Sequence, residues 1–419
     1  MKRRDAIKLG SAVLGGLSLG MLTGCKENYK KPEAFNTNTP SDDEKIASIV
    51  PKQTGQYNFS CPMPFDKHLI DELYNLNKGL KRCKITTFYS SIPSPLADEI
   101  HPFLSSVRGH NTSIQKIDDY IELLQYSEKK GFKNIYALNL TRQIMPEEKS
   151  GIYAKISGLF NKLTKAGLTD VKICNPSLIE LIHKNYPDMN IHISTNTEFH
   201  SAQNYEYVYK TFPFIKSINI ATDDNHNFHF LQSLKTLLPK VNLELLVNEH
   251  GCVKYCISRF YHQCTNAIAF PCKTFISNNP YLQLARNNLI HPWELAYYSA
   301  IGINNFKLTC LPYSRMMISD INFAKDYIGC ADRGLDGYSA NDLLGKIHYG
   351  MNDITRIKFP DDYKLEELAR ELPDMNYYVK NGHKCSYDCD VNCKYCYNIA
   401  ENLRKIVRNG KNAPAVQNT

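Results

Sequence analysis

Apolar residues along the chain gather in short runs that are separated by longer amphipathic stretches. Eight of these runs have four to six residues and the length and composition of strands buried in a parallel sheet. The eight predicted strands are Tyr57–Cys61, Ile85–Tyr89, Asn134–Asn139, Val171–Cys174, Asn190–Ser194, Ser217–Ala221, Leu243–Val247 and Phe306–Thr309.

Helical periodicity lies between most of these strands. The predicted helices include Ser113–Lys130, Gly151–Ala166, Ser177–Lys184, Phe228–Leu238, Pro292–Ala300 and, later, Leu365–Leu372. Asp66 can cap a helix that begins at Lys67, and Ser177 can lie in the first turn after Pro176. Eight strands that alternate with helices predict an α/β fold, a (β/α)8 barrel of the TIM type. A doubly wound open sheet is the alternative, but it needs a glycine-rich first turn that the sequence lacks.

Polar residues follow most of the predicted strands, at the end of a (β/α)8 barrel where function gathers. They are Ser90, Ser91, Arg108, Gly109, His110, Asn139, Asn175, Ser194, Thr195, Asn196, Asp223, Asp224, Asn225, Asn248, Glu249 and Arg315, with Lys307 inside the last strand. Each one alone is more often a turn or capping residue than a catalyst. Together they predict a polar pocket at this rim.

The first 25 residues have the features of an export signal. Lys2, Arg3, Arg4 and Lys8 accompany an apolar run, Leu9–Leu22, that is too short for a comfortable membrane span. The arginine pair resembles a twin-arginine signal, with general secretion as the alternative. Leu22-Thr23-Gly24-Cys25 resembles the lipobox of bacterial lipoproteins and predicts lipidation at Cys25, whereas an ordinary cleaved signal is the alternative. We therefore predict an exported lipoprotein that is anchored to a membrane on the periplasmic side of the cell envelope.

Composition and charge define the domains and exclude one class of partner. Residues 26–56 are polar and aperiodic, as in a linker, residues 57–330 form the predicted barrel, and residues 331–419 form a C-terminal extension. The formal charge is +8, of which residues 1–24 contribute +3, and acids and bases are interspersed in the rest. No basic stripe with interleaved aromatics is present, so a nucleic-acid partner is not expected.

The 14 cysteines carry most of the candidate chemistry. Without Cys25 an odd number remains, which does not suit a pure disulfide framework, although disulfides are the default in exported proteins. Four of them follow the seventh predicted strand closely. Thiolates gathered beyond the end of a strand indicate a metal or iron–sulfur site. The predicted ligands of this first site are Cys252, Cys256, Cys264 and Cys272.

Two residues beside this first cluster are candidates for catalysis. Glu249, directly after a buried strand, is predicted to act as acid or base, with hydrogen bonding to loop amides as its alternative role. His262 is a candidate ligand, proton donor or ordinary loop residue. A cysteine peptidase needs one thiolate paired with a histidine base, whereas crowded cysteines favour metal coordination.

Several segments resemble the collagenase-like peptidase family, peptidase family U32, and within it the radical-SAM-like barrel members. The matching segments are ICNPSLIELIHKNYPDMNIHIST, LELLVNEHGC, Cys256-x2-Arg259-x2-His262 and IHPWELAYYSAIGINNFKL. The resemblance covers most of residues 57–315 and implies a barrel of this type. It departs from the family at Cys310, where a glycine often precedes an arginine.

The resemblance also implies a chemistry. Better-understood relatives are oxygen-independent hydroxylation factors, and several hold a [4Fe–4S] cluster on four cysteines. Carried over, this implies Cys252, Cys256 and Cys272 as ligands, with Cys264 or His262 as the fourth. We therefore predict an iron–sulfur redox or hydroxylation enzyme that acts on an unknown small-molecule or peptide substrate. The alternatives are a peptidase and a non-catalytic binding lipoprotein whose metals brace the fold.

A second cysteine cluster, Cys385, Cys389, Cys393 and Cys396, lies near the end of the chain. The last three have the spacing of the radical-SAM motif, in which one iron stays open for S-adenosylmethionine. Only 23 residues follow Cys396, and Cys385 can close the site, so S-adenosylmethionine is not expected. A closed iron–sulfur site, structural or serving an electron-transfer partner, is the first interpretation. Structural zinc is the second, and two disulfides are the alternative.

Overall fold

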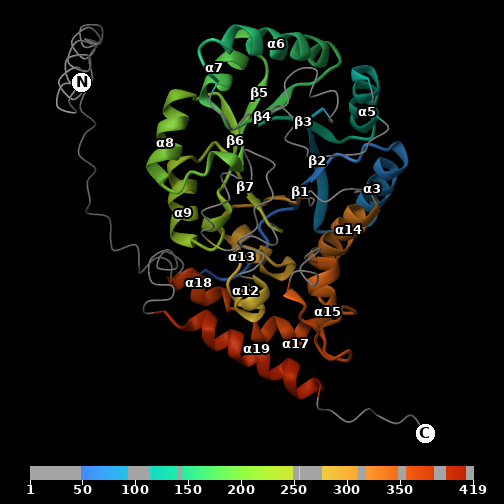
Figure 1. Cartoon of the computed structure of the whole chain (residues 1–419), viewed down its shortest axis with the longest axis vertical. Coiled ribbons are helices and arrows are strands. Elements are labelled where there is room, and N and C mark those ends of the chain that lie inside the picture. The colour runs from blue at the N-terminus through green and yellow to red at the C-terminus, as the bar shows by residue number, and fades with distance from the viewer. Residues whose placement is uncertain are drawn as a thin grey trace, which may run out of the picture. The chain divides into compact units, whose positions relative to one another are not determined.

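The computed structural model describes residues 49–92, 114, 116–139, 144–248, 254, 276–309, 318–347, 355–381 and 393–411. Its eight parallel strands close into a barrel in sequence order, as Figure 1 shows. The strands are β1 (Tyr57–Pro62), β2 (Cys83–Ser90), β3 (Lys133–Leu138), β4 (Asp170–Ile173), β5 (Asn190–Ile193), β6 (Ile215–Asn219), β7 (Asn242–Leu246) and β8 (Asn305–Lys307). The predicted (β/α)8 barrel is confirmed, and each predicted strand overlaps an observed one.

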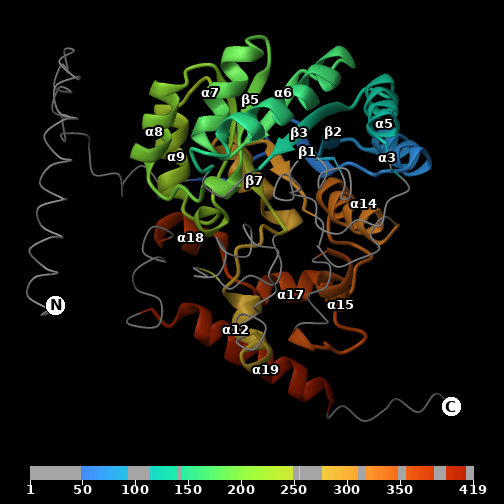
Figure 2. The same cartoon turned by 45° about the horizontal axis from the view of Figure 1, so that its top comes forward.

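Helices surround the strands (Figures 1 and 2). They are α3 (Lys67–Gly79), α5 (Ile117–Lys129), α6 (Lys149–Lys165), α7 (Pro176–Asn185), α8 (Ala202–Thr211), α9 (Phe228–Leu237), α12 (Pro280–Ala285), α13 (Leu295–Ala300) and α14 (Ile318–Arg333), with short 3-10 turns η1 (Thr195–Thr197), η2 (Thr222–Asp224) and η3 (Pro292–Glu294). The predicted helix Pro292–Ala300 is therefore a 3-10 turn followed by a short α-helix. None of the helices within these ranges combines the length and the apolarity that a bilayer crossing requires.

Two helix starts follow directly from the sequence. The Asp66 carboxylate accepts hydrogen bonds from the backbone N–H groups of His68 and Leu69, so it caps α3 as predicted. Asn175 caps α7 by accepting from the N–H of Ser177, while Pro176 occupies the first turn, where its missing N–H costs nothing.

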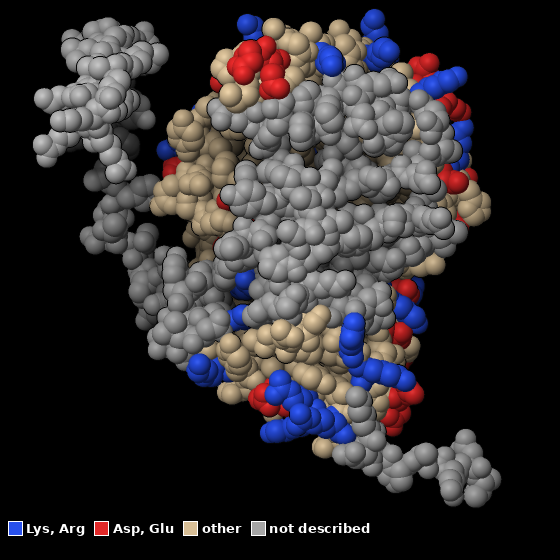
Figure 3. Space-filling model, viewed as in Figure 1, with Lys and Arg blue, Asp and Glu red and all other residues tan. Residues whose placement is uncertain are grey.

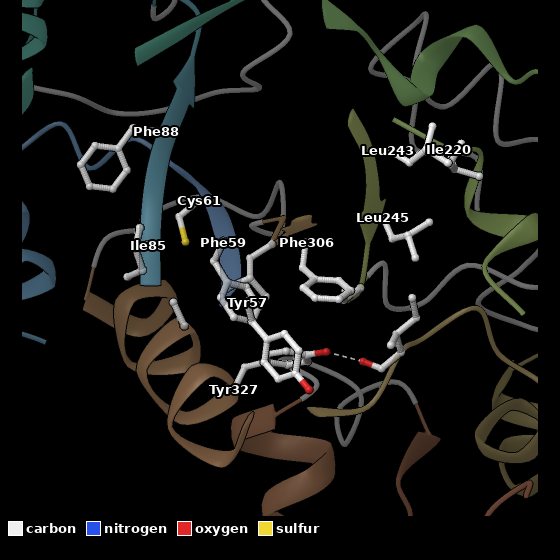
Figure 4. Close-up of a cluster of buried hydrophobic side chains, with 14 of the residues drawn as sticks. Tyr57, Phe59, Cys61, Ile85, Phe88, Ile220, Leu243, Leu245, Phe306 and Tyr327 are labelled. Carbon is white, nitrogen blue, oxygen red and sulfur yellow. Dashed lines mark hydrogen bonds between the residues drawn. The ribbon is translucent and has the colours of Figure 1, made fainter. Parts of the chain in front are cut away.

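The outer face of the barrel is apolar and packs against the helices. Phe59 of β1 and Phe306 of β8 are fully buried, with ring centroids 5.9 Å apart. Tyr327 of α14 meets the Phe59 ring edge-on at 6.1 Å, as Figure 4 shows. Large aromatic contacts of this kind remove much apolar surface from water, and they fix α14 across β1 and β8.

Two register shifts decide which side chains of the barrel face inward. Between Phe59 and Ser60 the pairing of β1 with β2 skips Thr86, and this shift turns Tyr89 toward the interior. Between Ile191 and His192 the pairing of β5 with β6 skips Lys216, and this shift aligns Ser217 with His192. Because side chains alternate along a strand, each extra residue inverts the faces that follow it.

A buried carboxylate joins the end of α14 to the start of β2. Asp332 Oδ1 accepts from the backbone N–H groups of Lys81 at 3.0 Å, Arg82 at 2.6 Å and Cys83 at 2.9 Å. The Arg82 guanidinium donates in return to the carbonyl oxygens of Ala331 and Asp332. A loop that would otherwise leave three N–H groups without partners is thereby fixed to a helix.

Residues beyond α14 add a helical layer. It contains α15 (Ala340–Asp342), the π-helical turn η4 (Leu343–Ile347), α17 (Leu365–Glu371), α18 (Met375–Asn381) and α19 (Tyr395–Lys411). The predicted helix Leu365–Leu372 corresponds to α17. Figures 1 and 2 agree that α19 lies along α12, where Ala400 packs against Leu282 and Ala285. Leu365, Leu368 and Val379 join the same apolar core as the barrel.

We expect Asp332→Ala to lower the free energy of unfolding by about 2–3 kcal/mol, because it leaves three backbone donors without their acceptor. Urea denaturation followed by circular dichroism measures the change. Asp336→Ala is the matched control, since Asp336 is exposed in the turn that follows the same helix, and it should shift stability by less than about 0.5 kcal/mol. Equal effects of both variants would contradict the role of Asp332.

Candidate active site at the carboxyl end of the barrel

Charged residues occupy the interior of the barrel, where TIM barrels normally hold branched apolar side chains. β4 reads Asp-Val-Lys-Ile and β7 reads Asn-Leu-Glu-Leu-Leu. In β7, Leu243 and Leu245 belong to the apolar core shown in Figure 4. The alternation of side chains therefore directs Glu244 inward, and Lys172 of β4 reaches it there.

Glu244 is the centre of a buried polar cluster. Its Oε2 atom accepts from Lys172 Nζ at 2.7 Å, and its Oε1 atom accepts from the Ser60 hydroxyl at 2.5 Å. The exposed fraction is 1% for Lys172 and 9% for Glu244. Since Ser60, Lys172 and Glu244 come from β1, β4 and β7, the cluster spans the interior of the barrel.

Tyr89 and Lys307 extend this cluster. The ammonium group of Lys307 lies 4.3 Å from the centroid of the Tyr89 ring, and that of Lys172 lies 5.9 Å from it. The Tyr89 hydroxyl donates to the carbonyl oxygen of Leu308 at 2.7 Å, which fixes the ring. A ring face is attractive to cations, so Tyr89 stabilises two positive charges inside the barrel. We call Ser60, Tyr89, Lys172, Glu244 and Lys307 the interior cluster.

The ionisation of Glu244 follows from these neighbours. Burial raises the pKa of its carboxyl, but the charge and hydrogen bond of Lys172, the charge of Lys307 and the hydrogen bond of Ser60 together lower the pKa to about 2. Glu244 is therefore an anion at any physiological pH and a weak base. It orients Lys172 rather than exchanging protons with a substrate.

Several polar residues predicted for the rim connect loops instead of lining a pocket. Asn288 donates to Asp223 at 2.5 Å, and Asn225 donates to the carbonyl oxygens of Leu246 and Asn288. Asn248 exchanges two hydrogen bonds with the backbone of Thr309. These contacts hold the segments after β6, β7 and β8 together.

Other rim predictions also have local roles. Ser194 caps η1 and Asn175 caps α7. The Ser90 hydroxyl lies 2.8 Å from that of Tyr120 on α5, on the outer side of the barrel. For these three residues the ordinary role of caps and packing is the observed one, and the prediction of a pocket does not apply to them.

His200, Glu198 and Asp224 form a charged group beyond β5 and β6. Hydrogen bonds from His200 to Asp224, at 2.9 Å, and to Glu198 raise the pKa of this histidine to about 10. Glu198 has a φ of 49°, in the left-handed region that residues other than glycine seldom adopt. At neutral pH the histidine is therefore a fixed cation, and it is unsuited to general acid–base catalysis.

Asp170, His192 and Ser217 form a hydrogen-bonded chain that has the composition of a hydrolase triad. His192 Nε2 lies 2.6 Å from Asp170 Oδ1, and Nδ1 lies 2.6 Å from the Ser217 hydroxyl. Asp170 also accepts from Lys133 at 2.6 Å and from Thr169 at 2.8 Å. Asp170 is the first residue of β4, toward the end of the barrel that serves stability. We therefore assign this chain to joining β4, β5 and β6.

Most of the residues predicted from the sequence as ligands or catalysts lie outside the described residues. They are Cys25, Glu249, Cys252, Cys256, His262, Cys264, Cys272, Cys385 and Cys389. Cys393 and Cys396 are half-buried at the start of α19, where the Tyr377 hydroxyl lies 3.2 Å from Cys393 Sγ. In the described ranges, no three His, Cys, Asp or Glu side chains are placed to hold one metal ion.

Sequence reasoning missed Lys172 and Glu244, although the signal was present. A strand buried on both faces should be apolar throughout. A charged residue between apolar neighbours, as in Val-Lys-Ile and Leu-Glu-Leu, marks a side chain that must find a partner inside the barrel. Lys307 in Asn-Phe-Lys-Leu follows the same rule.

Comparisons with known proteins find a family model that matches the central segment. Residues 105–266 match the model of Peptidase family U32, which confirms the resemblance over that range. No curated protein matches the chain. Among solved structures, a U32 peptidase has a TM-score of 0.42 at 10% identity, covering 62% of this chain and 95% of that one.

Two further solved structures are also similar to the chain. A trehalose-6-phosphate hydrolase from Bacillus licheniformis has a TM-score of 0.35 at 10% identity, covering 87% of this chain and 84% of that one. A glycerophosphodiester phosphodiesterase from Parabacteroides distasonis has a TM-score of 0.33 at 10% identity, covering 62% and 95%. Similarity at this level carries no functional argument.

Acidic and basic side chains are interspersed over the described part of the face in Figure 3.

The family match corrects the main functional prediction. An iron–sulfur redox or hydroxylation enzyme was the first interpretation, and a peptidase of the collagenase-like family was the alternative. The match to Peptidase family U32 contradicts the first and supports the alternative. The first interpretation rested on the spacing of cysteines along the chain, and most of these cysteines lie outside the described residues.

Two buried histidines make stability depend on pH. Burial lowers the pKa of His192, although Asp170 opposes the shift, and burial lowers the pKa of His226 well below its ordinary value. Below about pH 6.5 the unfolded chain binds protons that the folded chain does not, so stability falls as pH falls. Asp170 does not contribute between pH 7.5 and 5. Burial raises its pKa, but His192 and Lys133 lower it to about 2.

We expect His192→Gln to lose less stability than the unchanged protein between pH 7.5 and pH 5, because the neutral amide still donates to Asp170 and does not titrate. Urea denaturation at the two pH values gives the difference. His68→Gln is the control, since the His68 side chain is 80% exposed. An unchanged pH dependence in His192→Gln would show that folding does not lower the pKa of His192.

Proposed function

The chain carries a segment of Peptidase family U32 at residues 105–266, and from this premise we propose that it hydrolyses peptide bonds at the carboxyl end of its barrel. The observation that supports this proposal is the buried ion pair of Lys172 and Glu244. Both residues lie inside the matched segment, on strands whose carboxyl ends lead to the usual active-site face of a TIM barrel.

The interior cluster suits the charge that develops during peptide hydrolysis. Attack on a peptide carbonyl places negative charge on its oxygen, and groups already oriented toward that charge lower the barrier most. Lys172 and Lys307 are two cations in the interior, and Glu244 and Tyr89 hold them in place. Their role in the proposed reaction is to stabilise this oxyanion.

The proton transfers need a different group, because Glu244 is too weak a base. Glu249 stays our predicted acid or base. In the sequence it follows the last residue of β7 by three positions. A water molecule activated by Glu249 would attack the carbonyl carbon, and the same proton would then pass to the leaving amine.

Location and metal content stay predictions as well. Lipidation at Cys25 would hold the enzyme at a membrane on the periplasmic side, where its substrates would be exported or envelope peptides. Zinc at the C-terminal cysteines would brace the extension, and neither feature enters the proposed reaction.

We expect the double variant Lys172→Met and Glu244→Leu to lower kcat/KM on a generic peptide library by about 100- to 1,000-fold, the usual loss when an oxyanion donor is removed. Replacing both partners keeps the net charge of the interior unchanged and leaves neither ion of this pair alone, so the variant should stay folded. Cleavage is followed by mass spectrometry of the products, and circular dichroism checks the fold.

Two control variants separate this proposal from general damage. Lys216→Met removes an exposed lysine of β6, and Ser217→Ala removes the serine of the hydrogen-bonded chain. Both should keep kcat/KM within about threefold of the unchanged enzyme. A folded double variant with full activity would exclude the interior cluster from catalysis. If only Ser217→Ala lost activity, the active site would have to lie at the amino end of the barrel instead.

A further inference from the structure

The side chain of Asn219 is buried and has no hydrogen-bond partner. Asn219 is the last residue of β6 and is 0% exposed, and both its Oδ1 and its Nδ2 atoms lack partners within the described structure. Protein interiors rarely leave one buried amide atom unsatisfied, and here both atoms of one group are.

The position of Asn219 places it inside the barrel beside the interior cluster. Its Cα atom pairs with that of Glu244 on the neighbouring strand. Paired residues of parallel strands direct their side chains to the same face, and the Glu244 side chain spans the interior. Ser217, two residues earlier on β6, also faces inward to His192. The orphaned amide is therefore aimed into the barrel, at the carboxyl end of its strand.

A structural role does not account for this amide. Leucine has the same branched shape, although it is larger, and would leave no polar atom unpaired at this site. By contrast, Asn134 of β3 bonds Leu124 and Ser127, and Asn190 of β5 bonds Asp170. The missing partner of Asn219 is either a water molecule or a ligand.

The chemistry of the amide selects the kind of ligand. Asparagine presents one acceptor and one donor side by side. In an extended peptide, the N–H and C=O of one residue point to the same side, and together they match that pair. We propose that Asn219 binds the main chain of the peptide substrate through two hydrogen bonds, next to Lys172 and Glu244. This inference rests on the proposed function and deepens it by naming a binding residue.

The test compares Asn219→Leu with Asn134→Leu, which makes the same substitution at a satisfied amide on the outer side of β3. The probe is the library peptide that the unchanged enzyme cleaves fastest. We expect Asn219→Leu to raise KM about 10- to 100-fold with kcat within threefold, and to raise Tm, since an unpaired amide is removed. Asn134→Leu should lower Tm and leave KM unchanged.

The outcomes separate a ligand from a bound water. If Asn219→Leu lowers Tm as Asn134→Leu does and leaves KM unchanged, the amide is satisfied by a structural water and the inference fails. Asn219→Ala provides a second variant, with the same increase in KM expected.

Failure of the proposed function would be visible separately, because the unchanged enzyme would then cleave none of the peptides. In that case, peptide binding is measured as the increase in the Tm of the protein when the same peptides are added. A peptide-induced increase that is lost in Asn219→Leu supports the inference. An increase that is equal in both proteins, or absent from both, overturns it.

Discussion

The ion pair of Lys172 and Glu244 is the interaction on which the organisation of the barrel depends. Moving a carboxylate and an ammonium group out of water costs several kcal/mol for each ion, and only a close partner offsets this cost. The 2.7 Å contact supplies the partner, and Ser60 satisfies the second oxygen of Glu244. Loss of one ion alone would cost about 3–5 kcal/mol, so three strands are bound to a single arrangement.

Because the pair occupies the inner face of the sheet, the two faces of the strands have different roles. An interior that holds charges supplies little apolar burial, so the core must lie outside the sheet. There Phe59, Phe306 and Tyr327 pack between strands and helices. The outer face stabilises the fold, and the inner face is free to carry chemistry. This separation explains how a polar interior is compatible with a closed barrel.

The sequence was sufficient for the fold and insufficient for the site. Local signals such as the apolar runs, the Asp66 cap and the proline at the start of α7 predicted the strands and several helix starts, because each depends on neighbours in the chain. The inward direction of Tyr89 depends on the register shift at Thr86, and no local pattern in the sequence predicts this shift. The partner of Glu244 lies on a strand 72 residues away.

The cysteines also show that a pattern along the chain does not establish a site in space. Their spacing is a local property, and coordination requires that distant loops meet. Spacing therefore suggested a cofactor, whereas the family match of residues 105–266 supports a different class of enzyme. Charges inside apolar strands were the better guide, because burial forces them to have partners wherever the chain leads.

The degree of hydrogen bonding distinguishes the two ends of the barrel interior. Toward the amino end, Asp170 accepts from four side chains, and both nitrogens of His192 are bonded. Toward the carboxyl end, in the part of the chain that the structure describes, Oδ1 of Asn139, Oδ1 of Asn225 and both amide atoms of Asn219 are buried without partners. A satisfied network rigidifies, whereas unsatisfied groups raise the free energy of the empty protein and can be satisfied by a bound molecule. The physical chemistry of the interior thus points to the same functional end as the general rule for these barrels, from independent observations.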